Sequence, residues 1–294
     1  MAKRRELAEL TNSSSSFREA VYRFSTYRLA LLGLVVVATV ALMATFARVI
    51  APLGPTSLNL NSVAKAPGNG HWLGTDDVGR DVWARVAYGA RTSILVGLGA
   101  VTIALCIGIS VGLASGYFGK WVDTFLMRMT DGVMSIPPLI LVIVFISIVG
   151  PSLFSVLVVI ALSTWPTSAR LVRGQVLSLR EQEYITAARV IGVPTRKILT
   201  RHIFPNLLGP LSVVATFGIS NAILTEASLS FLGLGVRPPA PSWGQAVNLA
   251  QAPDVLLDKQ WMWIPAAFMI VITVLAVNFI GDGLRKAVDP KSVR

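Results

Sequence analysis

Long apolar stretches alternate with polar segments along the whole chain. Leu29–Ala47 runs for nineteen residues without a charge, and Ser93–Gly116 runs for twenty-four. A helix of about 20 apolar residues is long enough to cross the ~30 Å hydrocarbon layer of a membrane. Four further stretches complete a set of six, and they are Val133–Val149, Leu153–Ala169, Leu207–Val236 and Ile264–Ile280. The pattern predicts an all-α, polytopic membrane protein with six transmembrane helices.

Proline marks the third and fourth stretches. Only residues 150–152 separate the two, which predicts a tight hairpin of helices rather than one long element. The third stretch contains the pair Pro137-Pro138, and the fourth contains Pro166 after Trp165. Because proline removes a backbone N–H and crowds the preceding turn, both stretches are expected to be kinked.

The stretches divide the chain into segments of different character. We expect a cytoplasmic tail over residues 1–28, a first transmembrane helix over 29–47 and an extracytoplasmic loop over 48–92. A transmembrane core follows over 93–283, with a cytoplasmic loop at 170–206, and a cytoplasmic tail ends the chain at 284–294. The first apolar stretch exceeds a signal-peptide core and lacks a small-x-small cleavage site, so we interpret it as a retained anchor. A short interfacial helix is expected before it, at Phe17–Tyr27.

The distribution of Lys and Arg gives the orientation. With the N-terminus inside, nineteen cationic residues fall in inner segments and seven in outer segments. Inner loops of membrane proteins carry the excess of Lys and Arg, so both termini are expected in the cytoplasm.

Composition agrees with a membrane location. The chain is 53% hydrophobic and 14% charged, and its mean hydropathy is +0.66, whereas a soluble domain is about 25% charged. The net charge of +11 occurs without a nucleic-acid-binding motif. We therefore expect no nucleic-acid partner, and we assign the excess cations to contacts with anionic membrane lipid.

The segment Tyr184–Pro210 is a basic loop with its own apolar stripe. Ala187, Ala188, Ile191 and Ile198 are expected near one helical face, with arginines and a lysine around it. The interruption at 192–194, Gly-Val-Pro, predicts a helix, a turn and a short second helix. Spacing alone leaves two interpretations open, a docking loop for a partner and a solvated amphipathic linker.

The same segment carries a resemblance to a known family. Ala187-Ala188-x-x-x-Gly192, followed by Phe204-Pro205, is similar to the EAA loop of importer-type ABC permeases, whose short helix fits a cleft in the ATPase subunit. Thr186 stands where that pattern has Glu and His202 where it has Ile, so the role of that Glu does not carry over. The resemblance implies an ATPase-coupling set made of Ala187, Ala188, Gly192, Val193, Pro194, Thr195, Arg196 and Ile198.

Three further segments resemble the second permease subunit of dipeptide and oligopeptide importers. They are Leu73–Asp81, Phe231–Pro239, and Gly281–Arg285 with Asp289-Pro290. The resemblance, which covers Leu73 to the C-terminus, implies a type I ABC importer permease in a bacterial inner membrane that translocates di- or oligopeptides. Its implied partners are a homologous but different second permease, two cytoplasmic ATPase subunits and an extracytoplasmic substrate-binding protein. Nickel complexes and other solutes stay open as substrates.

Residues that carry enzyme chemistry are sparse. The chain has no Gly-rich loop ending in Lys-Ser or Lys-Thr, so it is not expected to bind ATP alone, and we expect no cofactor and no enzymatic activity. His71 and His202 fall on opposite sides of the membrane, and Cys106 has no second cysteine, so no metal site or disulfide is expected. The carboxylates of 76, 77 and 81 favour a hydrogen-bonded turn between glycines over a cation site.

One carboxylate lies inside a predicted span. Glu226 follows Asn221 and Thr225 in a polar run, and a carboxylate beside lipid is costly, so these groups are expected to face a wet pathway or a protein interface. We weigh equally a translocation path lined by Asn221, Thr225 and Glu226 and a Glu226 that holds a neighbouring loop or subunit. The first interpretation admits an alternative function, a proton-coupled secondary transporter.

Overall fold

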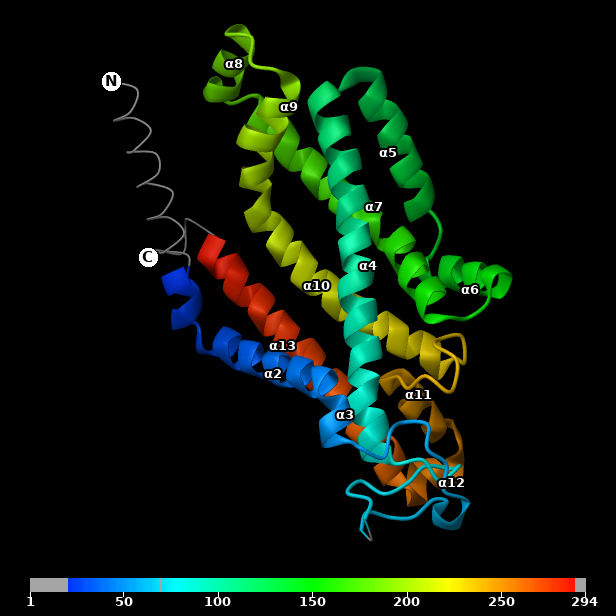
Figure 1. The fold of residues 1–294 in the computed structure, drawn as a ribbon. Coiled ribbons are helices and arrows are strands. Elements are labelled where there is room, and N and C mark those ends of the chain that lie inside the picture. Colours follow the sequence, from blue (N-terminus) through cyan, green and yellow to red (C-terminus); the bar gives the residue numbers. More distant parts are fainter. Residues whose placement is uncertain (1–20, 69, 289–294) are drawn as a thin grey trace.

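A computed structural model describes residues 21–68 and 70–288, which form a bundle of helices that cross one another at steep angles (Figure 1). Within these residues no strand occurs, and β-type pairing is limited to isolated bridges such as Thr75 with Asp81. Five helices are long and apolar enough to cross a membrane, or six when one bent pair of helices is counted as a single span. The prediction of an all-α protein with six spans is confirmed on that count.

The α-helices in chain order are α2 (Arg28–Thr45), α3 (Ala47–Ile50), α4 (Val82–Phe118), α5 (Lys120–Met134), α6 (Pro138–Val149), α7 (Leu153–Arg180), α8 (Glu183–Val190), α9 (Thr195–Lys197), α10 (Phe204–Phe231), α11 (Trp243–Asn248), α12 (Pro253–Asp258) and α13 (Ile264–Val288). A π-helix, Ile198–Ile203, joins α9 to α10, and 3₁₀ turns occur at Leu60–Ser62, Leu249–Gln251 and Gln260–Met262.

The third predicted span, Val133–Val149, is wrong as a single helix. α5 ends at Met134 and α6 begins at Pro138, and the two helix axes differ by 83°. The Pro137-Pro138 pair causes the break, because Pro137 has no N–H to donate and the residue before a proline avoids the helical region. By contrast, α7 continues through Pro166 as one helix.

Other predicted boundaries also move. α4 begins at Val82, well before Ser93, because the Asp81 side chain accepts a hydrogen bond from the Ala84 N–H at 2.8 Å and caps the helix. α10 ends at Phe231 rather than at Val236, and α13 continues beyond Ile280 to Val288. Hydropathy missed the ends of α4 and α13 because charged residues occupy them.

Two predictions about the tails fall partly outside the described residues. Of the interfacial helix expected at Phe17–Tyr27, residues 21–26 are helical, and the preceding residues are not described. Residues 289–294 of the predicted C-terminal tail are likewise not described, and residues 284–288 belong to α13.

α4 and α7 pack closely against each other at the centre of the bundle. Gly108, Gly112 and Gly116 lie one turn apart on α4, and a Cβ on any of them would meet α7 at 2.6–2.8 Å, at Ser168, Ala169 and Val176 respectively. Small residues at this spacing let two helix backbones approach closely. The glycines therefore let α7 lie close against the second half of α4. α4 itself is 37 residues long and extends from the turn before α5 down to the region of α11 (Figure 1).

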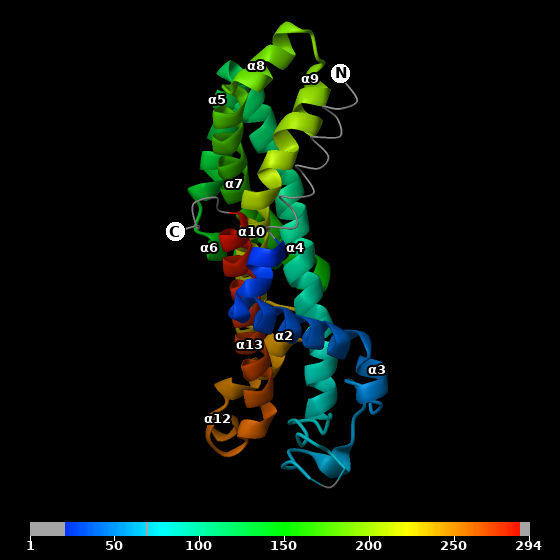
Figure 2. The same cartoon turned by 90° about the vertical axis from the view of Figure 1, so that its left-hand side faces the viewer.

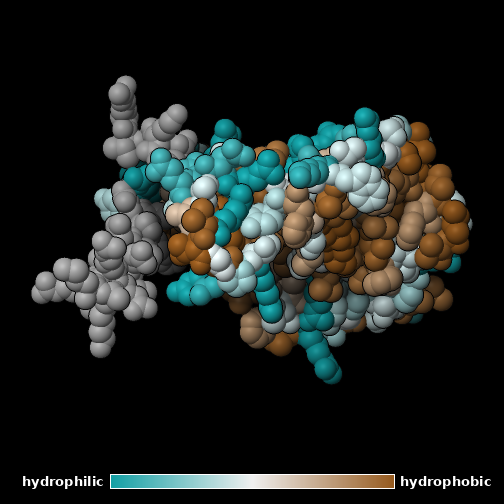
Figure 3. Space-filling model, turned by 90° about the horizontal axis from the view of Figure 1, so that it is seen from above, coloured by the Kyte–Doolittle hydropathy of each residue, from teal (hydrophilic) through white to brown (hydrophobic). Residues whose placement is uncertain are grey.

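The bundle has two distinct ends, visible in Figures 1 and 2. We call one the α8 end; it contains α8, α9 and the turn between α4 and α5. The other is the α12 end, which contains residues 51–68 and 70–81 and the segment 232–263 with α11 and α12. Viewed from the α8 end, apolar surface gathers toward the side of α6 (Figure 3), whose exposed side chains are Leu139, Ile140, Ile143, Val144, Ile148 and Val149.

Candidate functional site

The α8 end carries the helix, turn and short helix that the sequence predicts. α8 ends in a Schellman motif: Gly192 N–H donates to Arg189 O at 3.0 Å, and Val193 N–H donates to Ala188 O at 3.0 Å. Gly192 has φ +78°, a conformation that residues with a Cβ adopt at a cost. Pro194 then caps the short α9. Local backbone chemistry therefore favours this turn of the chain between α8 and α9.

The four apolar residues expected on one face do not stay together. Ala188 and Ile198 are buried, whereas Ala187 and Ile191 are exposed. Neighbouring helical residues point about 100° apart, so Ile185, three residues before Ala188, takes the inner position that Ala187 cannot reach. The inner residues pack on side chains of α4 and α7, and the cluster contains Val172, Val176, Ile185, Ala188, Ile198, Ile203, Leu207 and Leu211.

The outer side of α8 ends in an exposed apolar tip. Val190 is 82% exposed and Ile191 is 78% exposed. Tyr184, in the first turn of α8, is about half exposed. Of the remaining predicted coupling residues, Gly192, Pro194, Thr195 and Arg196 are exposed and Val193 is half-buried. We call Tyr184, Val190, Ile191 and these residues the α8 tip.

The π-helix after α9 is a feature that sequence reasoning missed. It places His202 beside α8, where its ring centroid lies 6.5 Å from that of Tyr184. π-helices are rare and short, and they occur often at functional sites. The only local signal is the pair of prolines downstream, Pro205 and Pro210, which constrain the first turns of α10.

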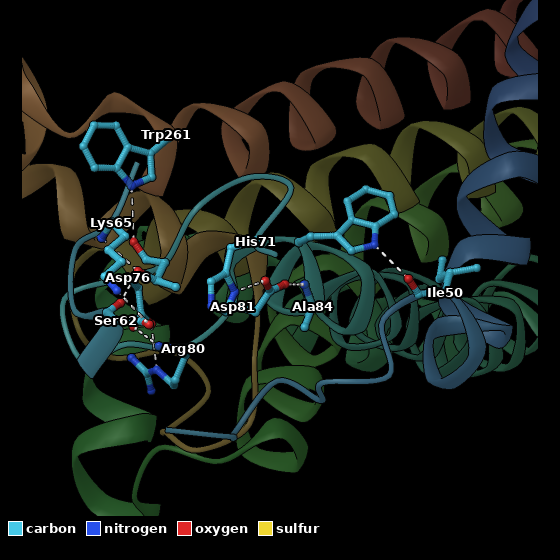
Figure 4. Close-up of polar contacts among 11 residues, drawn as sticks. Ile50, Ser62, Lys65, His71, Asp76, Arg80, Asp81, Ala84 and Trp261 are labelled. Carbon is cyan, nitrogen blue, oxygen red and sulfur yellow. Dashed lines mark hydrogen bonds and ion pairs between the residues drawn. The ribbon is translucent and has the colours of Figure 1, made fainter. Parts of the chain in front are cut away.

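At the α12 end, the predicted hydrogen-bonded turn is confirmed (Figure 4). Asp76 is buried; its Oδ1 accepts from the backbone N–H of Val78 at 3.1 Å and of Arg80 at 2.8 Å, and its Oδ2 accepts from Arg80 Nε at 2.7 Å. Asp81 caps α4 with one oxygen and pairs with His71 Nδ1 at 2.8 Å through the other. Among the described residues no group of three His, Cys, Asp or Glu side chains is placed to hold a metal ion.

The two loops of the α12 end are fastened to each other. Trp261 Nε1 donates to Thr75 O at 3.2 Å, and Trp243 Nε1 donates to Val86 O at 2.9 Å. Arg85 Nη2 donates to Gln245 Oε1 at 3.2 Å, while its Nε lies 3.6 Å from Asp76 Oδ2. Trp261 thus holds a neighbouring loop in place.

Glu226, on α10, is completely buried against α4 and the start of α11. Its Oε1 accepts from Ser230 Oγ at 2.7 Å and its Oε2 from Ser93 Oγ at 3.4 Å, while Ser242 Oγ contacts Ser230 Oγ at 3.4 Å. We call Ser93, Glu226, Ser230 and Ser242 the buried polar network. Sequence reasoning singled out Glu226 in a polar run that ends at Ser230, but it missed Ser93 and Ser242.

The structure does not bring the three predicted path residues onto one face. Asn221 is exposed and Thr225 is half-buried, with its hydroxyl donating to Asn221 O at 2.7 Å, whereas Glu226 points into the chain. Five residues of helix turn a side chain by about 140°, which accounts for the separation of Asn221 from Glu226.

Comparison with known proteins places the chain in a family. Residues 104–294 match the family described as binding-protein-dependent transport system inner membrane component. The chain belongs to this family. Residues 15–67 match the N-terminal transmembrane domain of oligopeptide transport permease C, a region in which sequence reasoning had found no resemblance. Family members are multi-pass inner-membrane transport components and not enzymes, which confirms the predicted class.

Relatives in several bacteria are similar over nearly their whole length. The putative peptide permease protein BRA0407/BS1330_II0404 of Brucella suis biovar 1 is 42% identical over 280 residues, covering 95% of this chain and 93% of the relative. Dipeptide transport system permease protein DppC of Alkalihalophilus pseudofirmus is 41% identical, covering 94% and 90%. Oligopeptide transport system permease protein OppC of Bacillus subtilis is 39% identical, covering 95% and 91%.

A solved structure shares the fold. A chain of the MetNI methionine ABC transporter in an inward-facing conformation superposes with a TM-score of 0.55 at 22% identity, covering 70% of this chain and 96% of that chain. The type I ABC importer permease fold that the resemblance implied is therefore confirmed.

Proposed function

We propose that this chain is one permease subunit of an ATP-driven importer that carries di- or oligopeptides into the cytoplasm. The observation that carries the proposal is the α8 tip, where apolar side chains are exposed on a helix whose inner side is packed firmly against α4 and α7. An exposed apolar surface rimmed by polar residues is typical of a protein interaction site. The names of the relatives support peptides as the substrate class.

The α8 tip is the docking site for the ATPase subunits, one of which accompanies each permease. Arg189, Arg196, Lys197 and Arg201 lie in this part of the chain, and an excess of cationic residues supports a cytoplasmic position for it. Both termini are then cytoplasmic too. Ala187, Gly192, Val193, Pro194, Thr195 and Arg196 present the contact surface, while Ala188 and Ile198 fasten it to the bundle.

The α12 end then faces outward and receives the substrate-binding protein. A six-span subunit supplies half of a pathway, so a homologous second permease completes it, and membrane lipid covers the remaining apolar surface. Asn221 and Thr225 are proposed to line the pathway. Glu226 has its carboxylate occupied by hydroxyl groups inside this chain, so we assign it to holding α4, α10 and α11 together.

Reconstitution of the complex in liposomes tests the proposal. Uptake of a labelled dipeptide should require ATP inside, the binding protein outside, and both permeases. A protonophore should leave uptake unchanged at fixed ATP. Uptake that continues without ATP but stops with the protonophore would overturn the proposal and favour a proton-coupled transporter instead.

A further inference from the structure

Arg189, in the last turn of α8, reaches two other helices. Its guanidinium carbon lies 5.2 Å from the centre of the Tyr117 ring, and Tyr117 is the penultimate residue of α4. Its Nη2 also donates to Arg180 O at 3.3 Å, at the end of α7. A guanidinium over an aromatic face within about 6 Å is attracted by the ring electrons. One side chain therefore joins α8 to the ends of α4 and α7.

Arg180 continues this connection into the turn between α4 and α5. Its Nη1 donates to Gly116 O at 3.0 Å, which satisfies a carbonyl in the last turn of α4. The turn residue Gly119 has φ +64°, and a Cβ there would lie 3.2 Å from Arg180 Nη1. The positive φ of this turn therefore favours glycine at 119, and the Arg180 guanidinium lies directly beside it.

A third arginine, Arg173 of α7, fastens α7 to the first turn of α5. Arg173 donates to both carboxylate oxygens of Asp123, from Nε and from Nη2, each at 2.6 Å. The Ser115 hydroxyl donates to the same carboxylate from α4. A bidentate arginine–carboxylate pair fixes both distance and orientation, so the first turn of α5 is held rigidly to α7.

These contacts are directional, and they lie over the shared apolar cluster that packs α8 on α4 and α7. The tip residues Val190 and Ile191 make no such contact and remain exposed. A displacement applied to the tip can reach the rest of the bundle through the apolar cluster, and the contacts of Arg189 and Arg180 give it a directional connection to the α4–α5 turn as well. α4 is a single helix whose first turn, at the α12 end, contacts Gln245 through Arg85. It therefore connects the α4–α5 turn to the opposite end of the molecule.

We propose that Arg189 and Arg180 are positioning residues that lock α8 to the α4–α5 turn, so that α8, the turn and the first half of α5 move as one body when the ATPases bind ATP. The proposal rests on the proposed function, since the tip must receive the ATPases. It goes beyond docking, because it states which contacts carry the movement after docking has occurred.

Substitutions at Arg189 and Tyr117 separate docking from transmission. Tyr117→Leu and Arg189→Gln should leave recovery of the ATPases with the complex unchanged, because the exposed tip is intact. Uptake per ATP hydrolysed should fall about tenfold, a size typical of coupling between sites. Tyr117→Phe keeps the aromatic face and should transport normally, and Arg201→Gln removes an exposed cation of the same loop as a matched control.

Each result decides a different statement. Failure of the ATPases to copurify with the unaltered permease would overturn the proposed function itself. Normal uptake per ATP in Tyr117→Leu and Arg189→Gln, with full ATPase recovery, would overturn only the positioning role. A loss in Tyr117→Phe equal to that in Tyr117→Leu would also contradict it, because the ring face is preserved in the first variant.

A distance measurement tests the single-body statement directly in the assembled complex. Spin labels at Thr186→Cys on α8 and Thr124→Cys on α5, both exposed positions, are placed on a Cys106→Ala background. The interspin distance should be the same without nucleotide and with ATP, and its distribution should broaden in Tyr117→Leu. A distance that changes on ATP binding in the otherwise unaltered protein would show that the two elements move independently.

Discussion

The two ends of the bundle both expose apolar side chains, but they differ in what lies behind them. At the α12 end, buried charges and side-chain hydrogen bonds fasten one loop to the other, as Asp76, Arg85 and Gln245 show. At the α8 end the inner layer is apolar and the polar contacts are arginines that bridge helix ends. The comparison indicates that buried charges and hydrogen bonds fix the structure of the α12 end. At the α8 end, α8 rests on an apolar layer, and arginine contacts to neighbouring helix ends fix its orientation.

The largest effect is expected from breaking the interior of the α12 end. Asp76→Ala removes the only carboxylate that contacts both Arg80 and Arg85 among the described residues. Loss of one partner of a buried ion pair costs about 3–5 kcal/mol, so folded protein recovered from membranes should fall sharply. The measurement is the thermal unfolding midpoint in detergent.

Asp76→Asn is the matched control for that change. It keeps an oxygen for the backbone N–H groups of Val78 and Arg80 but removes the charge, so its unfolding midpoint should lie between those of the wild type and the alanine variant. An alanine variant as stable as the wild type would contradict the role given to this carboxylate.

A smaller effect is expected from the buried polar network. Glu226→Leu leaves the hydroxyls of Ser93 and Ser230 without their acceptor, at a cost of roughly 1–3 kcal/mol. Glu226→Gln retains an acceptor oxygen and should stay close to the wild type in both stability and uptake. If Glu226→Gln instead abolished uptake while the complex assembled fully, the carboxylate would belong to the transport pathway.

The α8 end should respond in function more than in stability. Gly192→Val forces a β-branched residue into a left-handed conformation, which costs about 1–2 kcal/mol. Because a Cβ at 192 meets open space, the strain should redirect the chain after α8 without disturbing the bundle. We expect lower ATPase recovery and lower uptake at an almost unchanged unfolding midpoint. Normal ATPase recovery would show that docking does not depend on this turn.

The smallest effect is expected from an exposed ion pair on α12. Lys259 Nζ donates to Asp254 Oδ2 at 2.8 Å, and this hydrogen bond holds the pKa of Asp254 below its usual range. A lowered pKa contributes stability above the ordinary pKa of the group and loses it as the pH falls through the lowered value. Solvent screens such a pair, so Lys259→Ala should unfold at the wild-type temperature at pH 7 and at acidic pH. A lower unfolding temperature of Lys259→Ala at pH 7, with no difference at acidic pH, would show that the ion pair contributes to stability.

What the sequence predicts well is local. The turn at Gly192 to Pro194 follows from neighbouring residues, and so does the carboxylate turn around Asp76, because the partners lie within a few positions. The break between α5 and α6 was predicted as a kink at two prolines, but its angle of 83° depends on packing.

What the sequence misses depends on partners far apart in the chain. Ser93 and Glu226 are separated by 133 residues, and Arg85 and Gln245 by 160, so no spacing pattern relates them. The early start of α4 was missed for another reason. A search for uncharged stretches excludes Arg85 and Arg91, although Asp81 caps the helix before both.

Cysteine crosslinking at two equally exposed apolar positions tests the central claim most directly. Ile191 at the α8 tip is 78% exposed, and Leu60 at the α12 end is 79% exposed. On a Cys106→Ala background, Ile191→Cys in the assembled importer should crosslink to the ATPase subunit, and Leu60→Cys should not. Crosslinking of Leu60→Cys to the ATPase, with none from Ile191→Cys, would contradict the assignment of the α8 tip as the docking site.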